Sequence, residues 1–466
     1  MPQLLLELLS EEIPARMRAN AARDLERMAR ERLAAEGLLP EALKTFAGAR
    51  RLTLVAEGLA AAQADRSEEV KGPRTNAPNQ ALDGFLRKTG LTRDQLTERE
   101  GVWFATLKKT GRPTPQIVAE MVEAIVRDFP WPKSMVSGVS KLRWVRPLRR
   151  ILCVFDGQIV PVNIDGIKSG DTTQGHRFMG SGQPFKARDF EAYAEQLAKH
   201  YVVLDPDERK ARILDAAKTL CFARNLELVE DAGLLDEVVG LVEWPVPVLG
   251  DMDPDFLDLP PEVIRTSMRV HQRYFAVRDP ATGKLAPHFL AVANIDATDG
   301  GQTIALGNAK VLRARLADAR FFWDEDRKTR LEDRLEKLKG VTFHAKLGSM
   351  YDRVERITAL AVELAPIVGA KPDLAAQAAR LAKGDLVSGV VGEFPELQGI
   401  MGGYYAAAEG LSAEVVEAIR THYKPQGPAD EVPTAPVPVT VALADKLDTL
   451  VSFFGIDEKP TGSRDP

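Results

Sequence analysis

Three residues in the last third of the chain have types that suit metal chemistry: His344, Asp385 and Asp445. An imidazole nitrogen and carboxylate oxygens are accepted ligands of divalent transition metals, and a metal held in this way can activate water. The three residues are spread over a region with helical periodicity, so only the packing of several helices can bring them together. Their order therefore indicates a hydrolytic metal site, provided that the set of ligands is complete.

The set lacks one imidazole. The order resembles the HD phosphohydrolase pattern, which has a His-Asp pair at its centre, but here Gly384 precedes Asp385. Because the loss of one imidazole should abolish tight metal binding, we expect an HD-like scaffold at His344, Asp385 and Asp445 without a metal. Two alternatives stay open: a metal-dependent HD-type phosphohydrolase that uses these three residues as ligands, and ordinary surface carboxylates along helices.

Other catalytic motifs are absent from the sequence. It has no G-x-S-x-G, no H-E-x-x-H and no Cys-His set with metal spacing. It also lacks a P-loop and a G-x-G-x-x-G after a strand, which gives a nucleotide-binding fold no support. We therefore predict no catalytic residue in this chain.

The charges are segregated along the chain, although the net charge is only −5. Residues 131–150 contain six basic residues and no acidic one, whereas residues 225–264 contain eleven acidic residues and no basic one. A basic segment with interleaved Trp131 and Trp144 is typical of phosphate and base contacts, and it is equally compatible with a solvated surface. The acidic stretch Glu243–Glu262 should repel phosphate, which favours protein contacts or a solvated edge.

These charges give a set of candidate RNA contacts. Phosphate contacts require cations placed along the path of the backbone. The candidates are Lys133, Lys141, Arg143, Arg146, Arg269, His271, Arg273, Arg313, Arg315 and Arg320. Two other interpretations compete with RNA contact. Val270, Gln272 and Tyr274 fit the buried side of a strand, and Arg315 and Arg320 are spaced to pair with acids of their own helix.

The elements that position these residues change character along the chain. Short strands and helices alternate first, with a strand at 4–9, a helix capped by Ser10, a strand at 51–57 and helices near 79–89 and 117–129. Mostly β segments follow over 142–295, interrupted by helices near 187–200 and 207–225. The region after 308 has helical periodicity, including a helix over 372–393. This order predicts an α+β multidomain protein with a mixed α/β amino-terminal body, a β-rich middle and an all-α end.

Length and composition agree with several domains. At roughly 150 residues per domain, 466 residues correspond to about three. Two cysteines are too few for a disulfide framework, and no apolar run approaches the roughly 18 residues of a membrane helix. We therefore expect a cytoplasmic protein without a membrane segment.

Ten segments resemble the β subunit of the heterotetrameric bacterial glycyl-tRNA synthetase. They run over nearly the whole chain: Leu5–Pro14, Arg50–Leu52, Glu68–Pro73, Gly175–Phe178, Leu241–Pro245, Leu259–Ile264, Val270–Phe275, Gly307–Leu312, Arg315–Ala319 and Glu393–Gly399. The resemblance implies a non-catalytic tRNA-binding subunit of glycine–tRNA ligase that positions tRNA(Gly) for aminoacylation. It implies an α subunit partner in an α2β2 assembly. ATP, Mg and glycine would be used by that class II catalytic subunit, and this chain would hold no cofactor.

The resemblance also implies an architecture. Residues 1–130 would form the amino-terminal body, 131–307 a β-rich module similar to B3/B4 of the phenylalanyl-tRNA synthetase β subunit, and 308–466 a helical HD-like domain. Family members continue with a helical anticodon-binding domain, whereas this sequence stops at Pro466. We expect the chain to lack that domain and therefore anticodon recognition.

Overall fold

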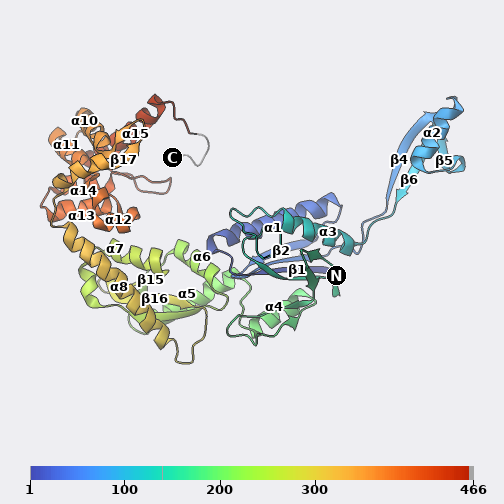
Figure 1. The fold of residues 1–466 in the computed structure, drawn as a ribbon, viewed down its shortest axis with the longest axis horizontal. Helices are drawn as coiled ribbons and strands as arrows, with labels where there is room; N and C mark the ends of the chain where they lie inside the picture. The colour runs from blue at the N-terminus through green and yellow to red at the C-terminus, as the bar shows by residue number, and fades with distance from the viewer. Residues whose placement is uncertain (1, 139, 461–466) are drawn as a thin grey trace. The chain divides into compact units, whose positions relative to one another are not determined.

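The structure is a computed structural model that describes residues 2–138 and 140–460 (Figure 1). The chain divides into two compact units. Unit 1 consists of Met1–Ala217, Asp231–Pro247 and Val292–Gly300. Unit 2 consists of Lys218–Glu230, Val248–Ala291 and Gly301–Pro466. The boundary expected after residue 130 falls inside unit 1 and the one after 307 falls inside unit 2, and the division into three domains stays a prediction.

Unit 1 is built on a mixed sheet. Its path is β2 (Ala42–Ala47), β3 (Arg51–Glu57), β1 (Gln3–Ser10), β7 (Leu148–Phe155), β10 (Ile167–Gly170) and β9 (Asn163–Ile164), with β8 (Gln158–Ile159) paired to β7. Strand β1 lies antiparallel between β3 and β7, and β10 is parallel to β7. Strand β1 is buried from Leu4 to Ser10, and burial on both faces accounts for its nearly unbroken run of leucines.

Helices cover the two faces of this sheet. Leu4, Leu6 and Leu8 pack with α1 (Ala15–Ala35) and α3 (Thr114–Arg127), because alternate residues of a strand point to the same side. Leu5 points the other way and packs with α4 (Phe190–Lys199). Glu7 also belongs to the α4 side, where its carboxylate accepts a hydrogen bond from Tyr193. A charged residue thus lies in the middle of a buried strand.

The rest of unit 1 is made of smaller elements. Strands β4 (Arg66–Arg74), β6 (Val102–Lys109) and β5 (Leu96–Arg99) form a separate sheet that carries α2 (Asn79–Thr89), drawn in light blue in Figure 1. The others are β11 (Thr172–Thr173), β12 (Phe185–Lys186), α6 (Ala232–Leu241) and most of α5 (Pro206–Phe222).

Unit 2 begins with a four-stranded sheet. Its order is β13 (Glu227–Leu228), β15 (Phe275–Arg278), β16 (Leu285–Ala293) and β14 (Val246–Asp251). The short helix α7 (Pro261–Thr266) precedes a π-helical turn at Ser267–Gln272, and the long helix α8 (Gln302–Asp326) follows the sheet. Side chains of the sheet, of α8 and of the following helices share one hydrophobic core.

The remainder of unit 2 is helical. Its helices are α9 (Leu331–Arg334), α10 (Met350–Val368), α11 (Pro372–Leu381), α12 (Gly389–Glu393), α13 (Ile400–Ala408), α14 (Ala413–Thr421) and α15 (Pro436–Gly455), with a hairpin of β17 (Thr342–His344) and β18 (Gly348–Ser349). This confirms a mixed α+β protein with an amino-terminal mixed sheet and a carboxy-terminal helical region. Within residues 2–138 and 140–460, no helix is both long and apolar enough to cross a bilayer.

Three local predictions were wrong. Ser10 does not cap a helix: it is the last residue of β1, its hydroxyl accepts a hydrogen bond from Trp144, and α1 starts only at Ala15. The helix expected over 372–393 is interrupted by a 3₁₀ turn at Gly384–Val387. The middle region also contains α6 and α7, which the β-rich interpretation did not include, because short helices leave only one turn or two of periodicity.

Candidate functional site

Residues 131–138 and 140–147 of the basic segment form an irregular loop between α3 and β7, and the last three residues of the segment begin β7. Asp165 fixes the loop: its Oδ2 accepts hydrogen bonds from the Lys141 amide at 3.0 Å and the Leu142 amide at 3.1 Å. The hydrogen bond from the Ser140 hydroxyl, together with that from the Lys141 amide, lowers the pKa of Asp165, which keeps this anchor charged. The loop is thus positioned by a carboxylate from outside the basic segment.

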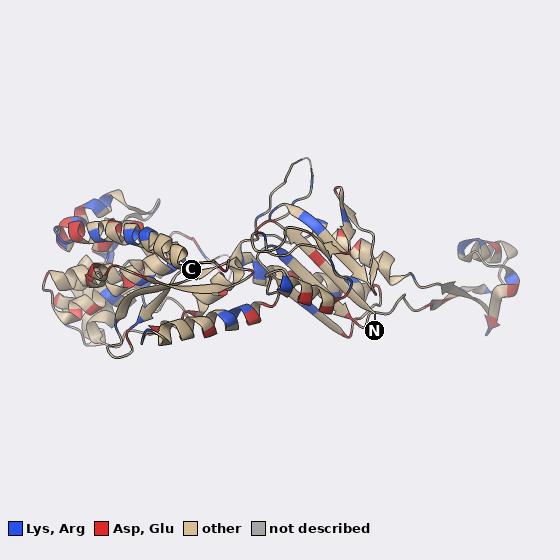
Figure 2. Cartoon of the chain, turned by 90° about the horizontal axis from the view of Figure 1, so that it is seen from below, with Lys and Arg blue, Asp and Glu red and all other residues tan. Residues whose placement is uncertain are grey.

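Cations of this loop project into solvent. Lys133, Lys141 and Arg143 are exposed, and none forms an ion pair within the described part of the chain. Arg146 is half-buried and donates a hydrogen bond of 2.8 Å to the carbonyl of Val145. Figure 2 shows basic and acidic positions distributed over both units, so the small net charge conceals local groups such as this one.

The aromatic residues of the segment have a structural role. The rings of Trp131 and Trp144 lie 5.1 Å apart, and each contacts Phe129. Trp144 is 2% exposed, and its Nε1 donates to the Ser10 hydroxyl at 2.8 Å. Trp144 is therefore not available to stack on a base, and the idea that it interleaves with the cations as a stacking surface was wrong.

Arg269, His271 and Arg273 lie at the π-helical turn of unit 2. The strand interpretation of this stretch was wrong, because regular strand structure begins only at Phe275. Arg273 adopts a left-handed conformation (φ 59°) and donates to the carbonyl of Arg269 at 3.3 Å. The His271 ring stacks on Phe394 at 5.2 Å, and its buried Nδ1 has no hydrogen-bond partner within residues 2–138 and 140–460.

The three arginines of α8 pair with acids of other elements. Arg313 lies 3.1 Å from Asp253 and Arg315 lies 3.6 Å from Glu393. Arg320 pairs with Asp258 and donates to the carbonyl of Asp255. The suggestion that Arg315 and Arg320 pair along their own helix was wrong. Part of the acidic stretch thus neutralises α8, and these guanidinium groups already have partners.

The carboxylates of the degenerate HD pattern lie in a buried cluster with a lysine at its centre. The Lys383 ammonium is 2.9 Å from Asp445 and 3.0 Å from Nε2 of His422. Asp445 also pairs with Arg353 at 3.0 Å. Lys383, His422 and Arg353 were not predicted as members of this cluster, although Lys383 lies only two residues before Asp385 in the sequence.

Asp385 accepts hydrogen bonds from the backbone. Its Oδ2 accepts from the amides of Gly399 at 2.6 Å and Gly402 at 2.8 Å. Burial raises the pKa of Asp385 to about 6 and lowers that of Lys383 to about 8. Burial also lowers the pKa of His422 to about 3, so this imidazole is neutral and accepts a hydrogen bond from the ammonium.

His344 belongs to a different environment. It ends β17, its ring lies 5.3 Å from that of Phe453, and its Nδ1 accepts from the Lys346 amide at 3.3 Å. Within the part of the chain that the structure describes, no three His, Cys, Asp or Glu residues form a group able to hold a metal ion. A cation at the centre of the cluster repels a second cation, so these residues do not fit a divalent metal.

A second buried ionic network lies in unit 1. Arg51 is fully buried and pairs with Glu7 at 2.8 Å and with Glu243 at 3.1 Å. Burial opposes the charge, but the two carboxylates outweigh it and raise the pKa of Arg51 above its ordinary value. The acidic stretch Glu243–Glu262 was expected to form a solvated edge or a protein contact. That expectation was wrong for Glu243, because its side chain is buried and paired with Arg51.

Comparison with known proteins gives the same family over nearly the whole chain. The family model described as "Glycyl-tRNA synthetase beta subunit" matches residues 4–466. A glycine–tRNA ligase beta subunit of Phenylobacterium zucineum is 81% identical over 469 residues, which covers 100% of this chain and 70% of that protein. The subunits of Cereibacter sphaeroides and Rhodospirillum centenum are 54% and 49% identical, with 100% of this chain covered and 68% and 70% of theirs.

Proposed function

The chain belongs to the glycyl-tRNA synthetase beta subunit family, and on that premise we propose that it binds tRNA(Gly) and positions it for a partner that carries out the chemistry. It is the β subunit of a glycine–tRNA ligase, and a β subunit implies an α subunit. The finer proposals are an α2β2 assembly in the cytoplasm, in which the α subunit uses ATP, Mg and glycine. This chain would then supply no cofactor and no catalytic group.

The observation that supports RNA contact is the unpaired charge of the basic loop. Lys133, Lys141 and Arg143 are exposed and have no ion pair within residues 2–138 and 140–460. Phosphates attract such cations strongly, because each contact releases counterions from the nucleic acid. The arginines of α8 would first have to break ion pairs with Asp253, Glu393 and Asp258. The basic loop is therefore the better contact.

Binding of tRNA(Gly) to the complete α–β complex tests this proposal. The triple variant Lys133→Gln, Lys141→Gln, Arg143→Gln should weaken binding and reduce the slope of log affinity against log salt by about 1 for each phosphate that the loop no longer binds. Affinity measured by fluorescence anisotropy over a range of salt concentrations gives both quantities.

A matched control removes three charges from the same unit. Arg27, Arg30 and Arg212 are exposed and each pairs with a carboxylate of its own helix. Their replacement by Gln should leave the salt slope unchanged. An equal reduction of affinity in the two triple variants, or no reduction in either, would contradict contact through the basic loop.

We also propose that the helical part of unit 2 is an HD-like domain that has lost its metal, and that the β-rich middle is similar to the B3/B4 module. The support for the first is that Lys383 occupies the centre between Asp445 and His422. Calorimetric titration of the full chain with Mn²⁺ should give no stoichiometric binding. Binding at one equivalent that is abolished in His344→Ala would instead support the phosphohydrolase alternative.

A further inference from the structure

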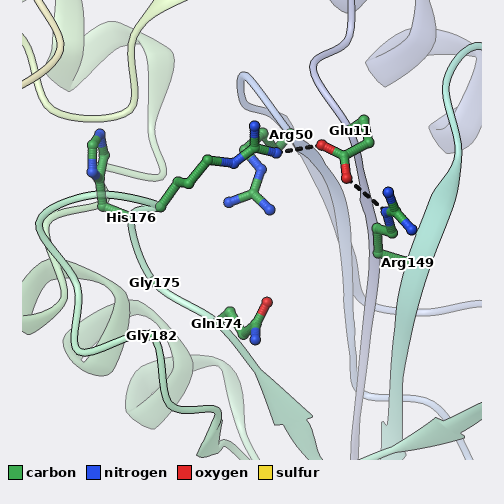
Figure 3. A pocket seen from close by; sticks show the side chains of 8 residues that line it. Glu11, Arg50, Arg149, Gln174, Gly175, His176 and Gly182 are labelled. Carbon is green, nitrogen blue, oxygen red and sulfur yellow. Dashed lines mark hydrogen bonds and ion pairs between the residues drawn. The ribbon is translucent and has the colours of Figure 1, made fainter.

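A cavity of about 410 Å³ opens on unit 1 where β1, β3 and β7 meet the loop 174–182. Three segments singled out for the family resemblance contribute to it: the end of Leu5–Pro14, the start of Arg50–Leu52, and Gly175–Phe178. The side chains come from strand ends on one side and from the loop on the other (Figure 3). The lining residues are Glu11, Arg50, Arg149, Gln174, Gly175, His176, Arg177 and Gly182.

Arg50 is the least satisfied residue of this cavity. It is only 9% exposed, and its buried Nε has no hydrogen-bond partner within the described ranges. Its neighbour Arg51 forms ion pairs with Glu7 and Glu243. Burial lowers the pKa of Arg50 below its ordinary value, although Glu243 counteracts this in part. A buried guanidinium N–H without an acceptor has lost its hydration with no hydrogen bond to compensate.

Two further guanidinium groups line the same cavity. Glu11 accepts a hydrogen bond from Arg149 at 2.6 Å and also pairs with Arg177. Arg177 also lies 2.8 Å from Glu12. The lining therefore presents three guanidinium groups and one carboxylate, and Glu11 orients two of the cations. An anion with several oxygens has acceptors for the N–H groups that Glu11 leaves free.

His176 shapes the loop beside the cavity. Its Nδ1 accepts hydrogen bonds from the amides of Phe178 at 3.2 Å and Met179 at 3.1 Å, so the ring proton is assigned to Nε2. That Nε2 is buried and has no partner among residues 2–138 and 140–460. The amide of His176 donates to the carbonyl of His200 at 2.9 Å, and the backbone passes so close to His200 that a Cβ on Gly175 would lie only 2.3 Å from its Cβ.

An exposed aromatic ring lies beside these donors. Phe178 is 75% exposed, and its ring centroid is 6.2 Å from that of His176. A ring that is so exposed next to a set of cations offers a stacking face to a base whose phosphate reaches the guanidinium groups. The volume exceeds the roughly 300 Å³ at which pockets begin to hold small organic ligands.

We propose that this cavity is a phosphate-binding site that takes a nucleotide, with Arg50, Arg149 and Arg177 on the phosphate and Phe178 stacked on the base. The nucleotide is either a free one or an unpaired nucleotide of bound RNA. The RNA source rests on the proposed function, whereas the phosphate site itself does not. The site lies in unit 1 and is separate from Lys133, Lys141 and Arg143, none of which lines the cavity.

Equilibrium dialysis of the full chain with inorganic phosphate and with AMP tests the site. Arg50→Gln should weaken both ligands at least tenfold. Phe178→Ala, which changes an exposed side chain and leaves the fold intact, should weaken AMP several-fold and leave phosphate unchanged. Arg27→Gln on α1 removes an exposed, ion-paired guanidinium of the same unit and should change neither.

The affinity of the α–β complex for tRNA(Gly) separates the two sources. If the nucleotide belongs to RNA, Arg50→Gln reduces the salt slope by about 1 and AMP competes with tRNA. If it is free, the variant no longer binds AMP and keeps its tRNA affinity. If the α–β complex binds no tRNA(Gly), the proposed function is contradicted. The dialysis with AMP and phosphate then decides by itself whether the cavity is a nucleotide site. Unchanged affinity of Arg50→Gln and Phe178→Ala for phosphate, AMP and tRNA would overturn the inference.

Discussion

Replacement of Arg51 by Met should strongly destabilise unit 1, because the change leaves two buried carboxylates without their counter-charge. Arg51 lies between Glu7 of β1 and Glu243 of the segment after α6, and all three side chains are almost fully buried. Met preserves much of the length of the side chain and removes only the guanidinium. The experiment therefore isolates the charge from the packing.

The magnitude follows from the contacts. The Arg51 guanidinium donates four hydrogen bonds: two to Glu243, one to Glu7 and one to the carbonyl of Gln174. Each bond to a charged partner contributes about 1.5–3 kcal/mol, but the desolvation of the charges opposes this gain. Removal of one partner from a buried ion pair costs about 3–5 kcal/mol. That is a fifth or more of the stability of a domain that is stable by about 5–15 kcal/mol.

Hydrogen exchange with mass spectrometry at increasing urea concentration measures this change in unit 1 alone. Peptides from β1 and β3 should exchange at lower urea in Arg51→Met, whereas peptides from α10 in unit 2 should not change. Tryptophan fluorescence adds a second signal, because Trp131 and Trp144 pack in the unit 1 core. Arg27→Met, which removes an exposed and ion-paired guanidinium, should behave like the parent chain.

Two results would refute the reasoning. A destabilisation of less than about 1 kcal/mol in Arg51→Met would mean that the carboxylates find other partners or water. In addition, Glu243→Gln should partly rescue Arg51→Met, because it removes one of the two stranded charges. Strict additivity of the two substitutions would show that Arg51 and Glu243 are not coupled.

Three further predictions concern unit 2. The pKa of Asp385 is raised from 3.8 to about 6 in the folded chain, so stability should fall as pH rises from about 4 to about 6, and Asp385→Asn should abolish that fall in urea midpoints measured across this range. The pKa of Lys383 is lowered from 10.5 to about 8 in the folded chain, so the unfolded chain binds more protons between pH 8 and pH 10.5 and the free energy of unfolding should rise with pH over that range. Lys383→Met should lack that rise, and a rise that persists in the variant would exclude Lys383 as its source. In Gly250→Ala the new Cβ would lie 2.2 Å from the buried Phe289 ring, so thermal unfolding should reveal a destabilisation of about 1–3 kcal/mol, and an unchanged midpoint would show that the ring can move.

The regular elements with strong local signals were predictable from the sequence. The strand at 51–57 and the helix at 79–89 occur at those positions as β3 and α2. Gly90 ends α2 in a left-handed conformation that glycine adopts without strain, which is a signal visible in one dimension. Ser10 had an equally good helix-start signal, but pairing of β1 with β7 extends the strand through that residue. Local propensity is a weak prior that strand pairing overrides.

The candidate site was predictable only in part. The positions of Lys133, Lys141 and Arg143 in one uninterrupted basic stretch are a property of the sequence, and their exposure agrees with it. The engagement of Arg313 with Asp253 and of Arg320 with Asp258 was not predictable, because each pair joins residues about sixty positions apart. The position of Lys383 between Asp445 and His422 likewise depends on the packing of separate helices.

The sequence by itself determined the family, the change from mixed strands and helices to a helical carboxy-terminal region, and the absence of complete catalytic motifs. Those properties follow from residues that are neighbours along the chain. Only the tertiary structure decided which charges are paired and which are left without partners. Arg50 and Arg51 are adjacent in the sequence, yet Arg51 lies between two carboxylates and Arg50 has an unpartnered Nε at a cavity. The difference arises because Arg51 begins β3, beside Glu7 of the neighbouring strand β1, whereas Arg50 lies in the bend before β3. Glu243, the second partner of Arg51, comes from a segment 192 residues away.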